Sequence, residues 1–120
     1  MEIMKAQEKI SEFDKARGWE GKWYVKDLAL NINEEIGELW NLIKWVDEAK
    51  QKQLAKEHID KVSDFIGDTL FLILKIANQT NVDADKALQE TLNEYEKRMP
   101  PKVMKKVKHA NKLAGGVDNK

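Results

Sequence analysis

The stretch from Phe65 to Ala77 constrains the fold more than any other part of the sequence. It is apolar on nearly every side of a helix, with Asp68, Thr69 and Lys75 as the main exceptions. A helix that is apolar all round is normally covered on all sides. A chain of 120 residues has few layers with which to cover it. We therefore predict that a second subunit helps to bury this helix.

The flanking sequence predicts three further helices around this one. Apolar residues recur at helical spacing over residues 1–16, 28–46 and 84–98. The central helix is expected over residues 57–79, and the charged residues 47–60 read as a helix end, a connection and its exposed start. The capping residues that we expect are Gly18 after the first helix, Asp27 before the second and Asp83 before the fourth.

These elements predict an all-α fold, a four-helix bundle completed by dimer or tetramer assembly. We find no alternating β pattern of useful length and no internal repeat. Residues 1–99 would form the helical domain. Residues 100–120 would form a basic, glycine-containing C-terminal tail, because Pro100 and Pro101 end the last helix.

Composition narrows the class of protein. Hydrophobic residues make up 42% of the chain and charged residues 35%, which is typical of a folded, helix-rich domain. The 21 basic and 21 acidic side chains cancel, so the net charge points to neither nucleic acid nor an anionic membrane. There is no cysteine, and the N-terminus lacks the apolar segment of a signal peptide. We expect a cytoplasmic protein.

Two pairs of acidic residues are the strongest chemical signal. Glu35 and Glu38 are three residues apart and share one helix face, and Asp64 and Asp68 are four apart and share another. Asp68 opens an apolar run, where a carboxylate is costly to bury unless a cation meets it. Oxygen ligands without cysteine suit a hard cation such as Mg²⁺, for which Mn²⁺ can substitute.

Each of these residues also has an ordinary structural reading. Glu35 and Glu38 could be surface charges, since charged helices often carry Glu at this spacing. Trp45 could belong to a core or an interface. Lys75 could be a lysine whose stem lies on apolar surface and whose ammonium reaches water.

Taken together, these segments resemble the MazG-type all-α nucleoside triphosphate pyrophosphohydrolases, in particular the short single-domain members typified by dCTP pyrophosphatase. The family is marked by EExxE followed by ExxD. Residues 34–38 (EEIGE) match the first motif completely, and residues 66–68 (IGD) echo the second. The likeness runs from about Phe13 to Gly116. It includes Arg17-Gly18-Trp19, Trp45 and Lys97-Arg98-Met99-Pro100.

One departure bears on the metal site that the resemblance implies. The glutamate of ExxD falls at Phe65, and Asp64 stands one place earlier. Asp64 still shares a helix face with Asp68, but its side chain is one methylene shorter than that of glutamate. Either Asp64 substitutes as a ligand or the site binds one ion fewer.

The resemblance implies an enzyme that hydrolyses a nucleoside triphosphate to the monophosphate and pyrophosphate, and so cleanses the nucleotide pool. Mg²⁺ would be held by Glu35, Glu38 and Asp68, with Asp64 as an uncertain fourth ligand. Either Glu34 or Glu38 would orient or deprotonate the attacking water. The residues that would bind substrate are Trp19 and Trp45 at the base, and Lys75, Arg98, Lys108 and Asn111 elsewhere, the cations neutralising phosphate charge.

A different class of protein remains an alternative. Phe65 would also suit a catalytically weak helical oligomer that binds nucleotides or serves as an interaction module. The resemblance further implies a homodimer or homotetramer, with no nucleic acid or membrane as partner.

Overall fold

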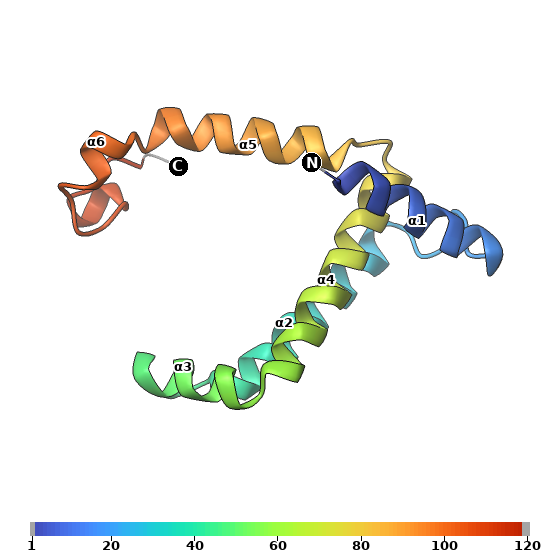
Figure 1. Ribbon diagram of the computed structural model, residues 1–120, viewed down its shortest axis with the longest axis horizontal. Coiled ribbons are helices and arrows are strands. Elements are labelled where there is room, and N and C mark those ends of the chain that lie inside the picture. Colours follow the sequence, from blue (N-terminus) through green and yellow to red (C-terminus); the bar gives the residue numbers. More distant parts are fainter. Residues whose placement is uncertain (1, 119–120) are drawn as a thin grey trace. The chain divides into compact units, whose positions relative to one another are not determined.

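The computed structural model describes residues 2–118 and is built from helices (Figure 1). The four predicted helices are confirmed, and the short helices α3 and α6 are additional to them. The elements in chain order are α1 (Ile3–Ala16), α2 (Val25–Ile43), α3 (Glu48–Glu57), α4 (Ile59–Gln79), α5 (Ala84–Arg98), α6 (Pro101–Met104) and the 3₁₀ helix η1 (Lys112–Ala114).

Helix α1 ends as predicted, with Gly18 just after its C-cap residue. Arg17 is the C-cap residue, and Gly18 has a φ of +68°, a left-handed conformation that glycine adopts at little cost. The amide of Trp19 donates a hydrogen bond of 2.8 Å to the carbonyl oxygen of Asp14. The chain therefore turns sharply after α1 and carries Trp19 back toward the helix bundle.

The predicted start of the second helix is wrong by three residues. The N-cap of α2 is Tyr24, whose side chain makes no capping hydrogen bond, and Asp27 lies inside the first turn. An acidic side chain there still interacts favourably with the positive end of the helix dipole. The connection that we expected around residues 47–60 contains helix α3, because the Asp47 carboxylate accepts a 2.8 Å hydrogen bond from the amide of Lys50 and caps it.

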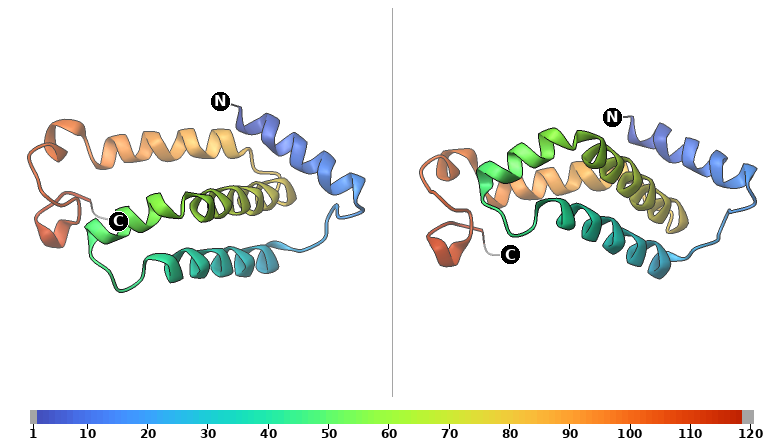
Figure 2. Two further views of the ribbon diagram at one scale, coloured as in Figure 1. Left: turned by 60° about the horizontal axis from the view of Figure 1, so that its bottom comes forward. Right: turned by 90° about the horizontal axis from the view of Figure 1, so that it is seen from below.

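Helices α2 and α4 lie side by side and run antiparallel, and α1 packs against α4 (Figure 2). The side-chain amide of Gln79, at the end of α4, donates to the carbonyl oxygens of Lys22 and Trp23, just before α2 begins. The side chains of Gln7 and Asn78 join α1 to α4 by a hydrogen bond of 3.1 Å. Among the described residues of this part of the molecule, the buried apolar ones are Leu28, Leu72, Leu74 and Ala77.

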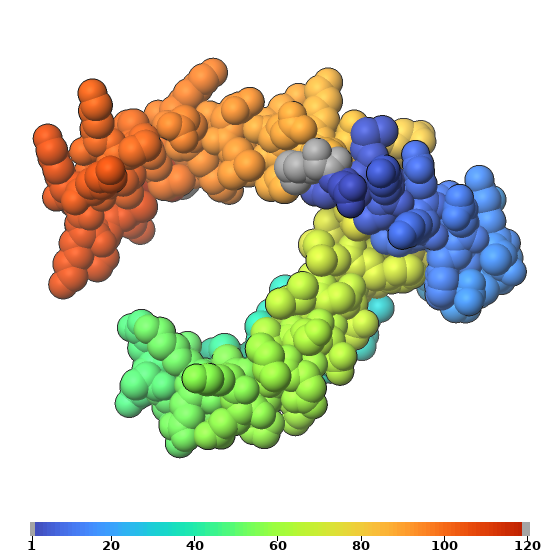
Figure 3. Space-filling model, viewed as in Figure 1, coloured from blue at the N-terminus to red at the C-terminus, as the bar shows by residue number. Residues whose placement is uncertain are grey.

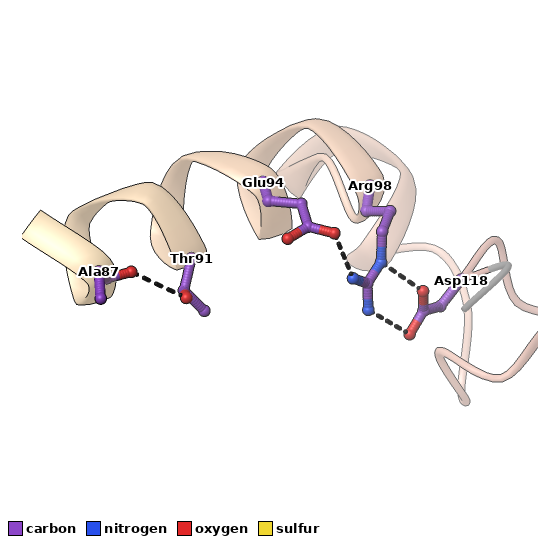
Figure 4. A network of polar contacts seen from close by, with 5 residues as sticks. All are labelled: Ala87, Thr91, Glu94, Arg98 and Asp118. Atoms are coloured by element: carbon purple, nitrogen blue, oxygen red, sulfur yellow. Dashed lines mark hydrogen bonds and ion pairs between the residues drawn. The ribbon is translucent and has the colours of Figure 1, made fainter. Parts of the chain in front are cut away.

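The chain divides into two compact units, Met1–Asp83 and Ala84–Lys120. In the second unit, Arg98 at the end of α5 donates to both carboxylate oxygens of Asp118, at 2.7 and 3.2 Å, and to Glu94 at 3.0 Å (Figure 4). The amide of Asp118 donates to the carbonyl oxygen of Ala110 at 3.0 Å. The C-terminal segment is therefore folded back on itself and held to α5. The boundary that we predicted between residues 99 and 100 stays a prediction.

Much apolar surface on α4 is left uncovered within the first unit. Ile66, Leu70 and Ile73 follow helical spacing, and each is about half exposed. The space-filling view shows side chains of α4, in yellow-green, at the surface (Figure 3). Within residues 2–118, no helix combines the length and the apolar character needed to cross a membrane.

Candidate active site

The predicted acidic residues of α2 and α4 come close to one another. Glu35 interacts electrostatically with Glu38 and Glu34 on its own helix and with Asp68 on α4. Because the two helices are antiparallel, the middle of α2 meets the first half of α4. The fold thus brings Asp68 near enough to Glu35 and Glu38 to interact with them, whereas helical spacing by itself placed only Glu35 and Glu38 on one face.

This arrangement raises the pKa of one carboxyl group. Partial burial, followed by the negative charges of Glu38, Asp68 and Glu34, raises the pKa of Glu35 above its ordinary value of 4.5. Like charges held near one another favour anything that removes a negative charge, either a proton or a bound cation. The acidic cluster formed by Glu35, Glu38 and Asp68 is therefore a local source of attraction for a positive ion.

Asp64 lies beside the same cluster, on the wall of a cavity of about 340 Å³. Phe65 lines this cavity too, so the missing ExxD glutamate is replaced by an apolar wall with a shorter acid next to it. Lys61, one turn before Asp64, brings a positive charge to the cavity. The residues around it are Glu38, Leu39, Asn41 and Leu42 of α2 and Lys61, Asp64 and Phe65 of α4.

The chemistry of these side chains fits a hard divalent cation. All of the donors are carboxylate oxygens, and their mutual repulsion favours binding of positive charge. Among residues 2–118, no three acidic or histidine side chains gather closely enough to enclose an ion. Mg²⁺ commonly takes only one or two carboxylates from a protein and completes its octahedron with water and substrate phosphates. A site of this kind needs no closed cage of side chains.

Two of the three cations predicted to neutralise phosphate charge, Lys75 and Arg98, are engaged elsewhere. The Lys75 ammonium is 3.0 Å from the Asp14 carboxylate, and the two side chains are only 2% and 9% exposed. Arg98 is held by Asp118 and Glu94 within the second unit, and its hydrogen bonds to Asp118 raise the pKa of the guanidinium. Lys61 is exposed and lines the acidic cavity, so it is better placed for this role than Lys75.

The two remaining substrate-binding candidates lie in the C-terminal segment. Lys108 is exposed to solvent. The side-chain oxygen of Asn111 accepts a 2.8 Å hydrogen bond from the amide of Leu113 and so caps η1. Asn111 therefore has a structural role, and a role of either residue in substrate binding stays a prediction.

The two candidate base-stacking tryptophans lie at opposite ends of α2. Trp19 precedes the helix and packs edge-on against Trp23, with ring centres 4.9 Å apart. Trp45 follows the helix, is 84% exposed and has a φ of +63°, a strained conformation for a bulky residue. Nineteen helical residues span about 28 Å, so one base cannot contact both indoles of one chain.

Sequence reasoning missed three residues that the structure draws attention to. They are Asp14 and Lys61, described above, and Trp23, whose ring centre lies 4.7 Å from the Lys75 ammonium. Asp14 follows Ile10 by four residues, on the apolar stripe of the first helix, and an acid on a buried stripe was the signal that could have identified it.

Comparisons with known proteins bear on the family and the fold of the chain. Residues 25–103 match the model of the MazG nucleotide pyrophosphohydrolase domain. No curated protein matches the chain. Among solved structures, a pyrophosphatase from Archaeoglobus fulgidus DSM 4304 has a similar fold, with a TM-score of 0.73 and 21% sequence identity over 83% of this chain and 94% of that one. Because the matched segment is more than half of the chain and contains both acidic segments, this protein belongs to the MazG nucleotide pyrophosphohydrolase domain family, whose members are hydrolases that act on nucleotides.

Proposed function

We propose that this protein hydrolyses a nucleoside triphosphate to the nucleoside monophosphate and pyrophosphate, with Mg²⁺ as cofactor. The observation that carries the proposal is the acidic cluster, where Glu38 and Asp68 help to raise the pKa of Glu35. Family membership supports the reaction class. The Archaeoglobus neighbour is a pyrophosphatase, which is consistent with this reaction.

The cofactor would be held by Glu35, Glu38 and Asp68, with Asp64 able to take the place of the glutamate that Phe65 replaces. When bound, Mg²⁺ would neutralise phosphate charge and lower the pKa of a coordinated water. Glu34 or Glu38 would orient the attacking water and accept its proton. Lys61 would neutralise phosphate charge at the rim of the same cavity.

The expected biological role is cleansing of the nucleotide pool in the cytoplasm. Removal of a modified, non-canonical or surplus triphosphate keeps it away from polymerases. We propose a homodimer or homotetramer as the active form, because the exposed apolar residues on α4 need a covering partner.

A panel of nucleoside triphosphates assayed with Mg²⁺ tests the reaction. Pyrophosphate should appear together with monophosphate, and hydrolysis in ¹⁸O-labelled water should place the label in one of these two products only. Asp68→Asn should lower kcat by at least about 100-fold, while Glu12→Gln, an exposed acid on α1, should leave it unchanged. Release of orthophosphate, or no turnover of any triphosphate, would contradict the proposal.

One observation favours a second function, nucleotide binding with little or no hydrolysis. Phe65 occupies the position where ExxD has a glutamate, and it forms an apolar wall of the acidic cavity. Phe65→Glu separates the two functions. If the site lacks an essential ligand, this variant should gain activity. If Asp64 already serves, it should gain none.

A further inference from the structure

The C-terminal segment of the second unit, residues 99–118, carries an uncompensated positive charge. It contains five lysines and a single carboxylate, that of Asp118, which Arg98 of α5 neutralises. All five lysines are exposed, and within residues 2–118 none of them forms an ion pair. They are Lys102, Lys105, Lys106, Lys108 and Lys112. The zero net charge of the whole chain therefore does not describe this segment.

Three of these lysines are close to one another along the chain. Lys105 and Lys108 are three residues apart, with Lys106 between them, so their backbones are separated by at most about 11 Å. That distance is roughly one Debye length at 0.1 M salt, so the ammonium groups repel one another in solution. An anionic surface that meets several of them at once would offset this repulsion.

A leucine of the same segment is almost completely exposed. Leu113 is 98% exposed, whereas Leu30 and Leu92, the next most exposed leucines among the described residues, are 55% exposed. Leu113 is the middle residue of η1, and its amide donates a 2.8 Å hydrogen bond to the side chain of Asn111. The amide of Gly116 donates to the carbonyl oxygen of Asn111 at 2.9 Å. The backbone therefore holds Leu113 in a closed turn that leaves its side chain in water.

The surroundings of Leu113 indicate the kind of partner that would cover it. A single exposed leucine needs no explanation by itself. Here it follows Lys112 directly and belongs to a segment with five exposed ammonium groups. At the surface of an anionic bilayer, an apolar side chain enters the boundary of the acyl chains while lysines remain at the headgroups. The combination of charge and apolar surface fits such a bilayer.

Nucleic acid fits this segment less well. Residues 99–118 contain no aromatic side chain on which a base could stack, and no arginine to bind a phosphate through two hydrogen bonds. Arg98, just before the segment, is held by Asp118 and Glu94. An exposed leucine adds nothing to phosphate contacts, whereas it does add to binding at a lipid surface.

We propose that residues 99–118 are a docking surface for a membrane rich in anionic phospholipids. Leu113 enters the interface between headgroups and acyl chains, and the lysines contact the phosphate headgroups. This function goes beyond hydrolysis of nucleotides, because it uses no residue of the acidic cluster. It also replaces the expectation of no membrane partner, which was drawn from the net charge of the whole chain.

Sedimentation of the full-length protein with lipid vesicles tests the proposal. Vesicles of phosphatidylcholine with one third phosphatidylserine should bind the protein at least about ten-fold more tightly than vesicles of phosphatidylcholine alone. An increase in salt from about 0.1 M to about 0.5 M should release most of the bound protein. Equal binding to both kinds of vesicle, or no binding to either, overturns the proposal.

Two substitutions of Leu113 test its insertion. Leu113→Gln keeps the charge of the segment and should lower the affinity for anionic vesicles at least about five-fold. Leu113→Phe should bind at least as tightly as the wild type. Because the side chain is exposed, neither variant should change the melting temperature or the activity measured without vesicles. If both variants bind like the wild type, the leucine is not inserted and the proposal is wrong.

A matched pair of double variants tests the lysines. Lys105→Gln with Lys106→Gln should lower the affinity about five-fold for each lysine, and so about 25-fold together. Lys52→Gln with Lys56→Gln removes the same charge from exposed positions on α3 and should leave the affinity unchanged. Equal losses in the two double variants would show that net charge alone attracts the protein, and would overturn the proposal.

Two further anions test the choice of partner. A DNA duplex should bind more weakly than anionic vesicles at the same phosphate concentration, and tighter binding of the duplex would assign the segment to nucleic acid instead. Pyrophosphate at about 1 mM should leave the protein on the vesicles, because it offers no apolar phase for Leu113 and only a few charges. Complete release by pyrophosphate would show that the lysines bind free phosphate groups, and would overturn the proposal.

Discussion

At the scale of the residue, the carboxylates of this protein lie in two opposite electrostatic environments. Asp14 is deeply buried and is paired with Lys75, so its charge is neutralised inside the fold. Glu35 is only partly buried and is surrounded by other acids, so its charge is left uncompensated. In a buried pair such as Asp14–Lys75, the negative charge is neutralised within the protein. In a cluster such as that of Glu35, the uncompensated negative charge favours binding of a cation.

Glu35→Gln should separate stability from metal binding. Without metal, it removes like-charge repulsion and should stabilise the protein by roughly 0.2–0.5 kcal/mol for each pair relieved. The rise in melting temperature that Mg²⁺ or Mn²⁺ gives the wild type should be lost. Thermal unfolding with and without metal measures both effects, and Glu12→Gln on α1 is the matched control. A variant that keeps the full metal-dependent rise would show that Glu35 is not a ligand.

The raised pKa of Glu35 also predicts a pH dependence. The folded protein keeps this proton to a higher pH than the unfolded chain does. The resulting contribution of Glu35 to the free energy of unfolding is therefore fully present below the ordinary pKa of 4.5. It is lost as the pH rises through the raised pKa. Metal affinity should increase over the same window, because the cation competes with the proton. Titrations of metal binding at a series of pH values should show this increase in affinity with pH in the wild type and a smaller increase in Glu35→Gln.

At the scale of the element, the C-terminal segment is held by few but specific contacts. Arg98 donates two hydrogen bonds to the carboxylate of Asp118. The amide of Gly116 donates to the carbonyl oxygen of Asn111, and that of Asp118 donates to the carbonyl oxygen of Ala110. A Cβ at Gly116 would overlap the carbonyl oxygens of His109 and Ala110. The basic composition of this tail therefore conceals a defined local fold.

Two substitutions should release this segment. Asp118→Asn removes the charge that holds Arg98, and Gly116→Ala introduces the steric overlap. Either one should make the chain cleavable by trypsin after Lys112 at least several-fold faster, with α5 left intact. Glu94→Gln weakens the partly exposed pair on the other side of Arg98 and should behave as the wild type does. Equal cleavage rates in all of these variants would show that the Arg98–Asp118 hydrogen bonds and the close packing at Gly116 do not hold the C-terminal segment.

At the scale of the whole molecule, the first unit has a small core and much exposed apolar surface. Four apolar residues among those described are buried, while Ile66, Leu70 and Ile73 of α4 form a half-exposed stripe. A chain with so little buried surface gains stability when another surface covers it. This is the structural basis on which we expect a dimer or a tetramer.

Leu70→Lys should disrupt that assembly, because it places a charge in the middle of the stripe. Light scattering after size exclusion should show an oligomer for the wild type and a smaller species for the variant, with a lower melting temperature. Gln51→Lys on exposed α3 adds the same charge away from the stripe and should not change the mass. A wild type that is monomeric at every concentration would contradict this expectation.

The sequence by itself determined the all-α class, the four main helices and the two acidic segments. These features depend on local periodicity, on caps such as Gly18 and on spacing along one helix, all of which are visible within a few residues. The family resemblance that rests on residues 34–38 and Asp68 is likewise confirmed. Helix α3 was missed because its composition resembles that of a charged connection, and only its cap at Asp47 indicates it.

Only the tertiary structure decided which charges meet. Lys75 and Asp14 are 61 positions apart in the sequence, and no local pattern pairs them before α1 packs on α4. The packing of α1 on α4 buries Lys75 beside Asp14, and the packing of α2 on α4 places Lys61 at the cavity that Glu38 and Asp64 line. Spacing determines which residues share one face of a helix. Which residues of another helix lie opposite that face depends on how the helices pack. The same packing sets which side chains could bind the base.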